Sequence, residues 1–68
     1  MRNNLKTLRQ QRNWTQTQVA EKVGVSRQTI YSIEQGIYVP STVLGLKLAA
    51  VFEMKLGDIF KLESEDWN

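Results

Sequence analysis

The chain has 68 residues, which suffice for one domain and are too few for a second hydrophobic core. It contains neither cysteine nor histidine, which excludes disulfide frameworks, thiolate zinc sites and histidine-dependent hydrolases. The net charge is only +2, but six of the nine basic residues and two of the seven acidic residues lie in residues 1–35. This uneven distribution favours an anionic partner such as nucleic acid.

No segment of the sequence is suited to a membrane or to secretion. The longest unbroken apolar run is residues 48–52, far shorter than the ~20 residues that a membrane-spanning helix needs. The N-terminus begins with polar and basic residues and lacks the apolar segment of a secretion signal. We therefore expect one domain over residues 1–68 that works in the cytoplasm without membrane contact.

The sequence predicts helices throughout, with weak strand signals only at the two chain ends. Leu5 and Leu8 fall on one face of a first helix over residues 5–12. Asn4 directly precedes them and is the expected N-cap of this helix.

A second helix is predicted to begin after Thr15. Gln18 follows Thr15 by three residues, so the pair forms a capping box, and Trp14 before the cap can pack on Val19. Gly24 ends the helix at a position that favours a left-handed residue.

Two further helices begin at serine caps. Ser26 caps a third helix that Gly36 ends, and Ser41 caps a fourth that runs to about residue 53. A short last turn covers residues 56–60. The positions expected to be buried in the fourth helix are Leu44, Leu48, Phe52 and either Val51 or Ala49. The predicted fold is therefore all-α.

Residues 16–35 carry the pattern of a helix-turn-helix motif. Ala20 is small where the second helix must approach its neighbour, and Gly24 provides the turn. Ile30 and Ile33 then fall on the inner face of the third helix. A larger side chain at Ala20 would force the two helices apart.

The opposite face of the third helix is polar and lacks acidic residues. Its side chains fall within one arc of about 140°: Arg27, Gln28, Tyr31, Ser32 and Gln35. Arginine can bind guanine through two hydrogen bonds, and glutamine can bind adenine in the same way. The face is thus suited to reading bases, and an ordinary solvated face is the alternative.

The motif and its surroundings form one pattern over about residues 4–60. It includes Trp14-Thr15-Gln16, Val19-Ala20, the run from Val23 to Ile30, Ile33-Glu34, Gly36 and Pro40-Ser41. This pattern resembles the phage-repressor-type (Cro or XRE) helix-turn-helix regulators, and the short ending Asp58-Ile59-Phe60 resembles the subfamily that includes the cytolysin repressor. The resemblance implies a five-helix lambda-repressor-like DNA-binding domain, usually a homodimer, that represses or sometimes activates transcription.

The resemblance also implies roles for individual residues. Gln16 matches a phosphate contact, which agrees with the preference of helix N-termini for phosphate. Tyr31 lies at a variable position where we expect a base contact, and Tyr38 either binds a phosphate or packs over Pro40. The full set of expected DNA contacts is Gln16, Ser26, Arg27, Gln28, Thr29, Tyr31, Ser32 and Tyr38, with Arg27, Gln28 and Ser32 reading bases.

Two features of the pattern concern structure rather than recognition. Arg9 matches the family's ionic partner of Glu34, and a merely solvated Glu34 is the alternative. The subfamily pairs its chain ends in a small sheet, here Arg2-Asn3 with residues 61–63. Their low β-propensity leaves this terminal β-hairpin an open question.

The function that we expect is sequence-specific recognition of double-stranded DNA by a transcriptional repressor, with helix 27–35 in the major groove. Arg2, Lys6, Arg12 and Arg27 are offered as phosphate contacts, and the operator should be nearly palindromic. Residues 56–68 are the expected dimerisation end, through Leu56, Ile59, Phe60 and Leu62, and Trp67 is either a free terminal residue or an interface anchor.

The alternative function is that of an antitoxin-like DNA-binding protein that acts mainly through a protein partner. An enzyme is not expected, because the sequence offers no histidine or cysteine for a nucleophile–base pair. We also expect no metal, cofactor or small-molecule ligand.

Overall fold

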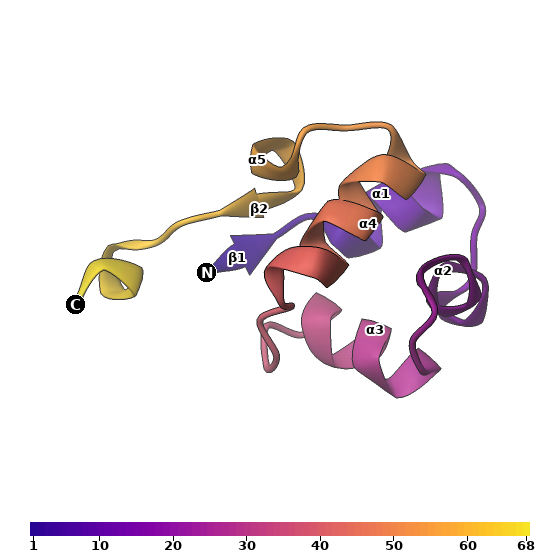
Figure 1. Ribbon diagram of the computed structural model, residues 1–68, viewed down its shortest axis with the longest axis horizontal. Coiled ribbons are helices and arrows are strands. Elements are labelled where there is room, and N and C mark those ends of the chain that lie inside the picture. Colours follow the sequence, from indigo (N-terminus) through magenta and orange to yellow (C-terminus); the bar gives the residue numbers. More distant parts are fainter.

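The computed structural model describes all 68 residues and contains five α-helices and a two-stranded sheet. In chain order the elements are β1 (Arg2–Asn3), α1 (Leu5–Gln11), α2 (Gln16–Val23), α3 (Arg27–Glu34), α4 (Thr42–Phe52), α5 (Leu56–Ile59), β2 (Phe60–Lys61) and a 3₁₀ turn (Ser64–Trp67). The helices form one body in which α2 packs against both α3 and α4, α1 contacts α3, and α5 packs against α4 (Figure 1). The expected all-α domain is therefore confirmed, and none of its helices is long and apolar enough to cross a membrane.

Three of the four predicted N-caps are confirmed. The Thr15 side chain accepts a hydrogen bond from the Gln18 backbone N–H, and the Gln18 side chain accepts one from the Thr15 N–H, which completes the capping box. Ser26 and Ser41 accept from the backbone N–H three residues later in the same way. These bonds satisfy donors that a helix N-terminus would otherwise leave unpaired.

The first helix begins differently from the prediction. The Asn4 side chain makes no cap bond and donates instead to the Asp58 carbonyl oxygen. Asn3 supplies the acceptor, since its Oδ1 lies 3.1 Å from the Leu5 nitrogen, and its amide nitrogen donates to the Ile33 carbonyl oxygen at 2.9 Å. Asparagine side chains thus tie the start of α1 to α3 and α5.

The core gathers apolar side chains from all five helices and from β2. It consists of Leu5, Leu8, Val19, Ala20, Val23, Ile30, Ile33, Leu44, Leu48, Ala49, Phe52, Ile59 and Phe60. Of the two alternatives for α4, Ala49 is buried and Val51 is half-buried. Ile59 and Phe60 belong to this core, which corrects their expected place in an exposed dimer surface. The small domain needs both to close the end of the helical body.

The chain ends pair as a short antiparallel sheet, which settles the open question of the termini. Arg2 faces Lys61 and Asn3 faces Phe60, so β2 begins one residue earlier than the segment expected from the resemblance. The Asn4 backbone N–H continues the contact by donating to the Ile59 carbonyl oxygen. Backbone hydrogen bonds from buried neighbours outweigh the weak β-propensity of these residues.

Beyond β2 the chain leaves the helical body as an extended segment that ends in the 3₁₀ turn (Figure 1). The Met1 ammonium lies 3.1 Å from Glu63 Oε1 and 3.0 Å from Asp66 Oδ2. Trp67 and Leu62 are largely exposed. The terminal segment is therefore held to the chain start by ion pairs rather than by packing.

Gly45 lies inside α4, where glycine costs about 1 kcal/mol relative to alanine. A Cβ atom built at this position would lie 3.2 Å from Leu56 Cδ1. The missing methyl group therefore lets α5 approach α4 closely.

Candidate nucleic-acid interface

The helix-turn-helix motif forms through a tight turn between α2 and α3. Gly24 adopts a left-handed conformation with φ of +76°, as predicted, and its N–H and that of Val25 both donate to the Ala20 carbonyl oxygen. Ala20 itself is buried in the core. The small side chain and the glycine together let α3 cross closely under α2.

The outer side of α3 is polar and open to solvent. Arg27, Gln28 and Gln35 are exposed, and the Tyr31 side chain is 40% exposed. Ser32 is half-buried at the edge of this side. Glu34 is the only acidic residue of α3, and it points inward. The exposed side of α3 thus carries donors for bases and phosphates and no charge that would repel them.

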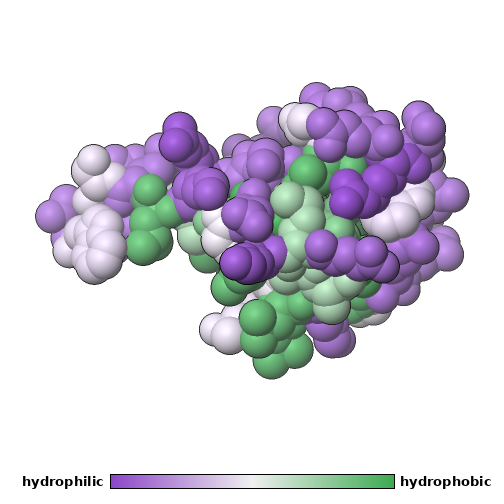
Figure 2. Space-filling model, turned by 90° about the horizontal axis from the view of Figure 1, so that it is seen from above, coloured by the Kyte–Doolittle hydropathy of each residue, from purple (hydrophilic) through white to green (hydrophobic).

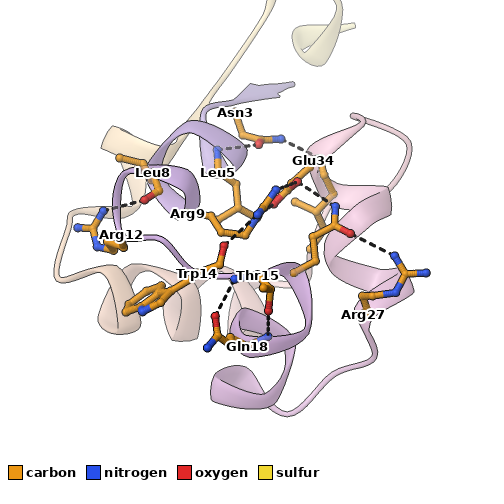
Figure 3. Close-up of polar contacts among 12 residues, drawn as sticks. Asn3, Leu5, Leu8, Arg9, Arg12, Trp14, Thr15, Gln18, Arg27 and Glu34 are labelled. Atoms are coloured by element: carbon orange, nitrogen blue, oxygen red, sulfur yellow. Dashed lines mark hydrogen bonds and ion pairs between the residues drawn. The ribbon is translucent and has the colours of Figure 1, made fainter.

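Glu34 and Arg9 form an ion pair between α3 and α1 (Figure 3). Arg9 Nε donates to Glu34 Oε2 at 2.7 Å and Arg9 Nη2 donates to Oε1 at 3.2 Å. The Glu34 side chain is 0% exposed and that of Arg9 is 11% exposed. Arg9 Nη1 also donates to the Trp14 carbonyl oxygen at 2.9 Å. This two-pronged geometry compensates a carboxylate that would be costly to bury alone.

Gln16 extends this network to the exposed side. Its Nε2 donates to Glu34 Oε1 at 3.1 Å, and its Oε1 accepts from Arg27 Nη1 at 3.2 Å. Because an ionised carboxylate only accepts hydrogen bonds, it fixes the amide nitrogen toward Glu34 and the amide oxygen toward Arg27. A chain of hydrogen bonds therefore runs from the largely buried Arg9 through Glu34 and Gln16 to the guanidinium of Arg27, which is expected to read a base.

The remaining expected contacts divide between α3 and the loop after it. The Ser26 hydroxyl lies 3.0 Å from the Thr29 hydroxyl and caps α3, so both groups are already engaged at its start. Tyr38 is partly exposed, and its backbone N–H donates to the Ser32 carbonyl oxygen. The structure thus brings the eight expected contact residues to the start of α2, to α3 and to the following loop.

Arg12, which the sequence analysis offers as a phosphate contact, lies elsewhere. Its guanidinium donates to the carbonyl oxygens of Leu8 and Phe52 and lies over the rings of Trp14 and Phe52. In Figure 3 it lies on the opposite side of the drawn network from Arg27. Arg12 therefore joins the ends of α1 and α4. The only sequence feature that indicates this role is the position of Arg12, four residues after Leu8 and at the end of a helix.

Comparison with known proteins agrees with this geometry. The sequence pattern of the helix-turn-helix family matches residues 5–59. The chain belongs to this family. A helix-turn-helix regulator of Bacillus subtilis, the uncharacterized transcriptional regulator YgzD, is 47% identical over 97% of this chain and 100% of its own length. An uncharacterized regulator of the same type from Methanocaldococcus jannaschii is 48% identical over 97% of this chain and 100% of its own.

Solved helix-turn-helix structures are also similar. The LexA SOS-response repressor of Eubacterium rectale matches with a TM-score of 0.77 and 31% identity over 81% of this chain. The chain spans 58% of that protein's length. The SinR protein in its complex with SinI matches with a TM-score of 0.75 and 26% identity, over 93% of this chain and 67% of the other. The family consists of DNA-binding transcriptional regulators rather than enzymes, and this helix-turn-helix chain is one of them.

Proposed function

We propose that the protein is a repressor that binds a near-palindromic operator as a homodimer and reads the major groove with α3. The observation that carries this proposal is the charge of α3. Its one carboxylate, Glu34, is fully buried against Arg9, while Arg27 and Gln28 are exposed on the other side. The repressor role also follows the similarity to LexA, which is named a transcriptional repressor.

The contacts of Arg27 and Gln16 suggest different tasks for the two residues. Arg27 lies at the exposed start of α3, where a guanidinium can make two hydrogen bonds to guanine. Gln16 lies at the first position of α2, and Glu34 accepts only one of the two hydrogens of its amide nitrogen, so the other can be donated to a backbone phosphate. Arg27 should therefore set sequence preference, and Gln16 should set affinity for DNA of any sequence.

The homodimer is supported by apolar surface that the single chain leaves exposed. Of the four residues expected at the interface, Leu56 and Leu62 are 37% and 61% exposed. Val39 and Leu56 line one groove beside Gly45, and Leu46 is exposed on the same helix as Gly45. Figure 2 shows apolar atoms gathered into a band on the face seen from above, bordered by polar side chains. We call Val39 and Leu56 the dimer patch, because a second copy would bury it symmetrically.

Selection of bound duplexes from a random library tests the proposal. The selected sites should contain two half-sites about 10 base pairs apart, because dimer recognition helices lie about 34 Å apart. On a selected site, Arg27→Ala should cost about 1–3 kcal/mol and relax preference at one base pair. Gln16→Ala should weaken all sequences equally, and Gln10→Ala on the exposed side of α1 is the matched control. If Arg27→Ala keeps the wild-type ranking of sites, Arg27 does not read a base.

The dimer is tested at the patch rather than at Phe60, since Phe60 belongs to the core. Leu56→Asp should give folded monomers that bind a single half-site weakly, and Leu62→Asp should act in the same direction, whereas Gln10→Asp on the exposed side of α1 is the comparison. Sedimentation and operator titration measure the two properties. A wild-type protein that sediments as a monomer at micromolar concentration and binds the operator fully would contradict the dimer.

A further inference from the structure

A groove runs between α3, the proposed recognition helix, and α4, on the side of α3 that faces away from Gln16. Its polar rim consists of Gln28, Thr29 and Ser32 from α3, with Tyr38, Ser41 and Lys47 on the α4 side. Its floor is apolar and includes Val25 and Leu44. Gln16 is not among the lining residues, since its contacts to Glu34 and Arg27 lie on the α2 side of α3. The recognition helix therefore has two different flanks.

Lys47 is the only charged residue that lines this groove, and the DNA contacts assigned above do not include it. It is the only charged residue in α4, whose sequence is otherwise Thr-Val-Leu-Gly-Leu before it and Leu-Ala-Ala-Val-Phe after it. Its side chain is exposed and forms no ion pair. No acidic residue lines the groove. The one charge of an apolar helix thus faces the recognition helix in a groove without a counter-charge.

The groove matches the chemistry of a DNA strand. A deoxyribose offers apolar carbons that suit the floor, and its phosphate offers acceptors for hydroxyl groups and an ammonium group. A helix seated in a major groove about 12 Å wide has one sugar–phosphate strand on each side. If Gln16 contacts the strand on the α2 flank, the other strand must pass along the α4 flank.

We propose that this groove holds the second strand and that Lys47 neutralises one of its phosphates. The inference rests on the proposed binding of α3 in the major groove. It adds a phosphate contact that the sequence analysis does not name. With it, the protein holds the two strands that border the major groove through different helices, Gln16 from α2 and Lys47 from α4.

The test is the salt dependence of binding to a selected operator. Each neutralised phosphate contributes a slope of about −0.9 to the plot of log K against log salt. Lys47→Gln should therefore reduce the slope by about 1.8 for a dimer and leave the ranking of sites unchanged. Lys47→Arg should keep the wild-type slope. Lys55→Gln is the matched control, because Lys55 is exposed at the start of α5, on the far side of the body from α3 (Figure 1).

Ethylation of single phosphates identifies the strand. Gln16→Ala should abolish interference at a phosphate on one border of the major groove, and Lys47→Gln should abolish it at a phosphate on the other border. A wild-type slope in Lys47→Gln, or a changed ranking of sites, would overturn the inference while leaving the proposed function intact. Failure of the wild-type protein to select any duplex would instead overturn the proposed function.

Discussion

The half of the molecule up to the end of α3 and the half that follows it are stabilised in different ways. In the first half, caps close the start of α2 and of α3, and an ion pair with a buried carboxylate joins α1 to α3. In the second half, Ser41 caps α4, but α4 is mainly apolar with Leu46 exposed, α5 has only four residues and β2 has two. The first half satisfies its own polar groups and presents a polar surface, which suits DNA. The second leaves apolar surface uncovered, which suits a second copy of the chain.

The largest effect should follow from breaking the ion pair of the first half. Arg9→Met leaves the fully buried Glu34 carboxylate with only Gln16 as a side-chain partner, and loss of one partner from a buried pair costs about 3–5 kcal/mol. Urea unfolding followed by circular dichroism measures the change. The double variant Arg9→Met with Glu34→Met should recover most of the stability, because apolar side chains can replace a buried pair at little cost. An unchanged midpoint in the single variant would show that the pair is not needed for stability.

An intermediate effect should follow from removing the hydrogen bonds by which Arg12 connects the two halves. Arg12→Met removes two hydrogen bonds to carbonyl oxygens at the ends of α1 and α4, and it removes the cation from the Trp14 and Phe52 rings. We expect a loss of about 1.5–3 kcal/mol in the free energy of unfolding. The slope of DNA binding against salt should not change. Arg27→Ala is the complementary variant, since it should weaken DNA binding and leave the unfolding midpoint near that of the wild type.

The smallest effect should concern the terminal segment. Hydrogen bonds to Asp66 and Glu63 raise the pKa of the Met1 ammonium above its ordinary value of 8.0. The Glu63 backbone N–H and that ammonium lower the pKa of Asp66 below its ordinary value of 3.8. The Met1 ammonium therefore stabilises the contact between the chain start and the terminal segment fully below pH 8.0. This contribution is lost as the pH rises through the raised pKa of the ammonium. The Asp66 contribution is present above pH 3.8 and is lost as the pH falls through the lowered pKa.

The fluorescence of Trp67 next to this ion pair reports the docking. Its emission should be constant near neutral pH and change at both extremes, without a change in the helical circular dichroism. Asp66→Asn should remove the acidic transition, and acetylation of the α-amino group should remove the alkaline one. Identical profiles in all three proteins would show that the ion pair does not hold the segment.

Features that depend on neighbouring residues could be predicted from the sequence, and features that depend on distant ones could not. Thr15, Ser26 and Gly24 act on backbone groups within four residues, so their roles follow from spacing alone. Asn3, by contrast, bonds to Ile33, and Arg12 bonds to Phe52. Neither pairing leaves a local pattern. The 3₁₀ turn was missed for the same reason, because the chain start holds it.

The candidate site shows the same division. The outer side of α3 follows from helical periodicity, and the structure places Arg27 and Gln28 there as exposed residues. The hydrogen bonds that link Arg9, Glu34, Gln16 and Arg27 form only when α1, α2 and α3 are packed together, so the sequence does not predict them. Ile59 and Phe60 are expected at a dimer interface but lie in the core, because apolar residues near a chain end give the same pattern whether they cover the core or a partner. The place of Lys47 depends on α4 lying beside α3, which no local pattern specifies.

The methyl group that Gly45 lacks has a consequence for the proposed dimer. It sets the separation of α4 and α5, and Leu56 of the dimer patch lies directly against it. An alanine there needs only a small shift of the flexible Leu56 tip, whereas a larger residue must displace α5 and, with it, Leu56 of the proposed dimer patch. In the proposed dimer, the separation of the two α3 helices would then change while α3 itself keeps its sequence.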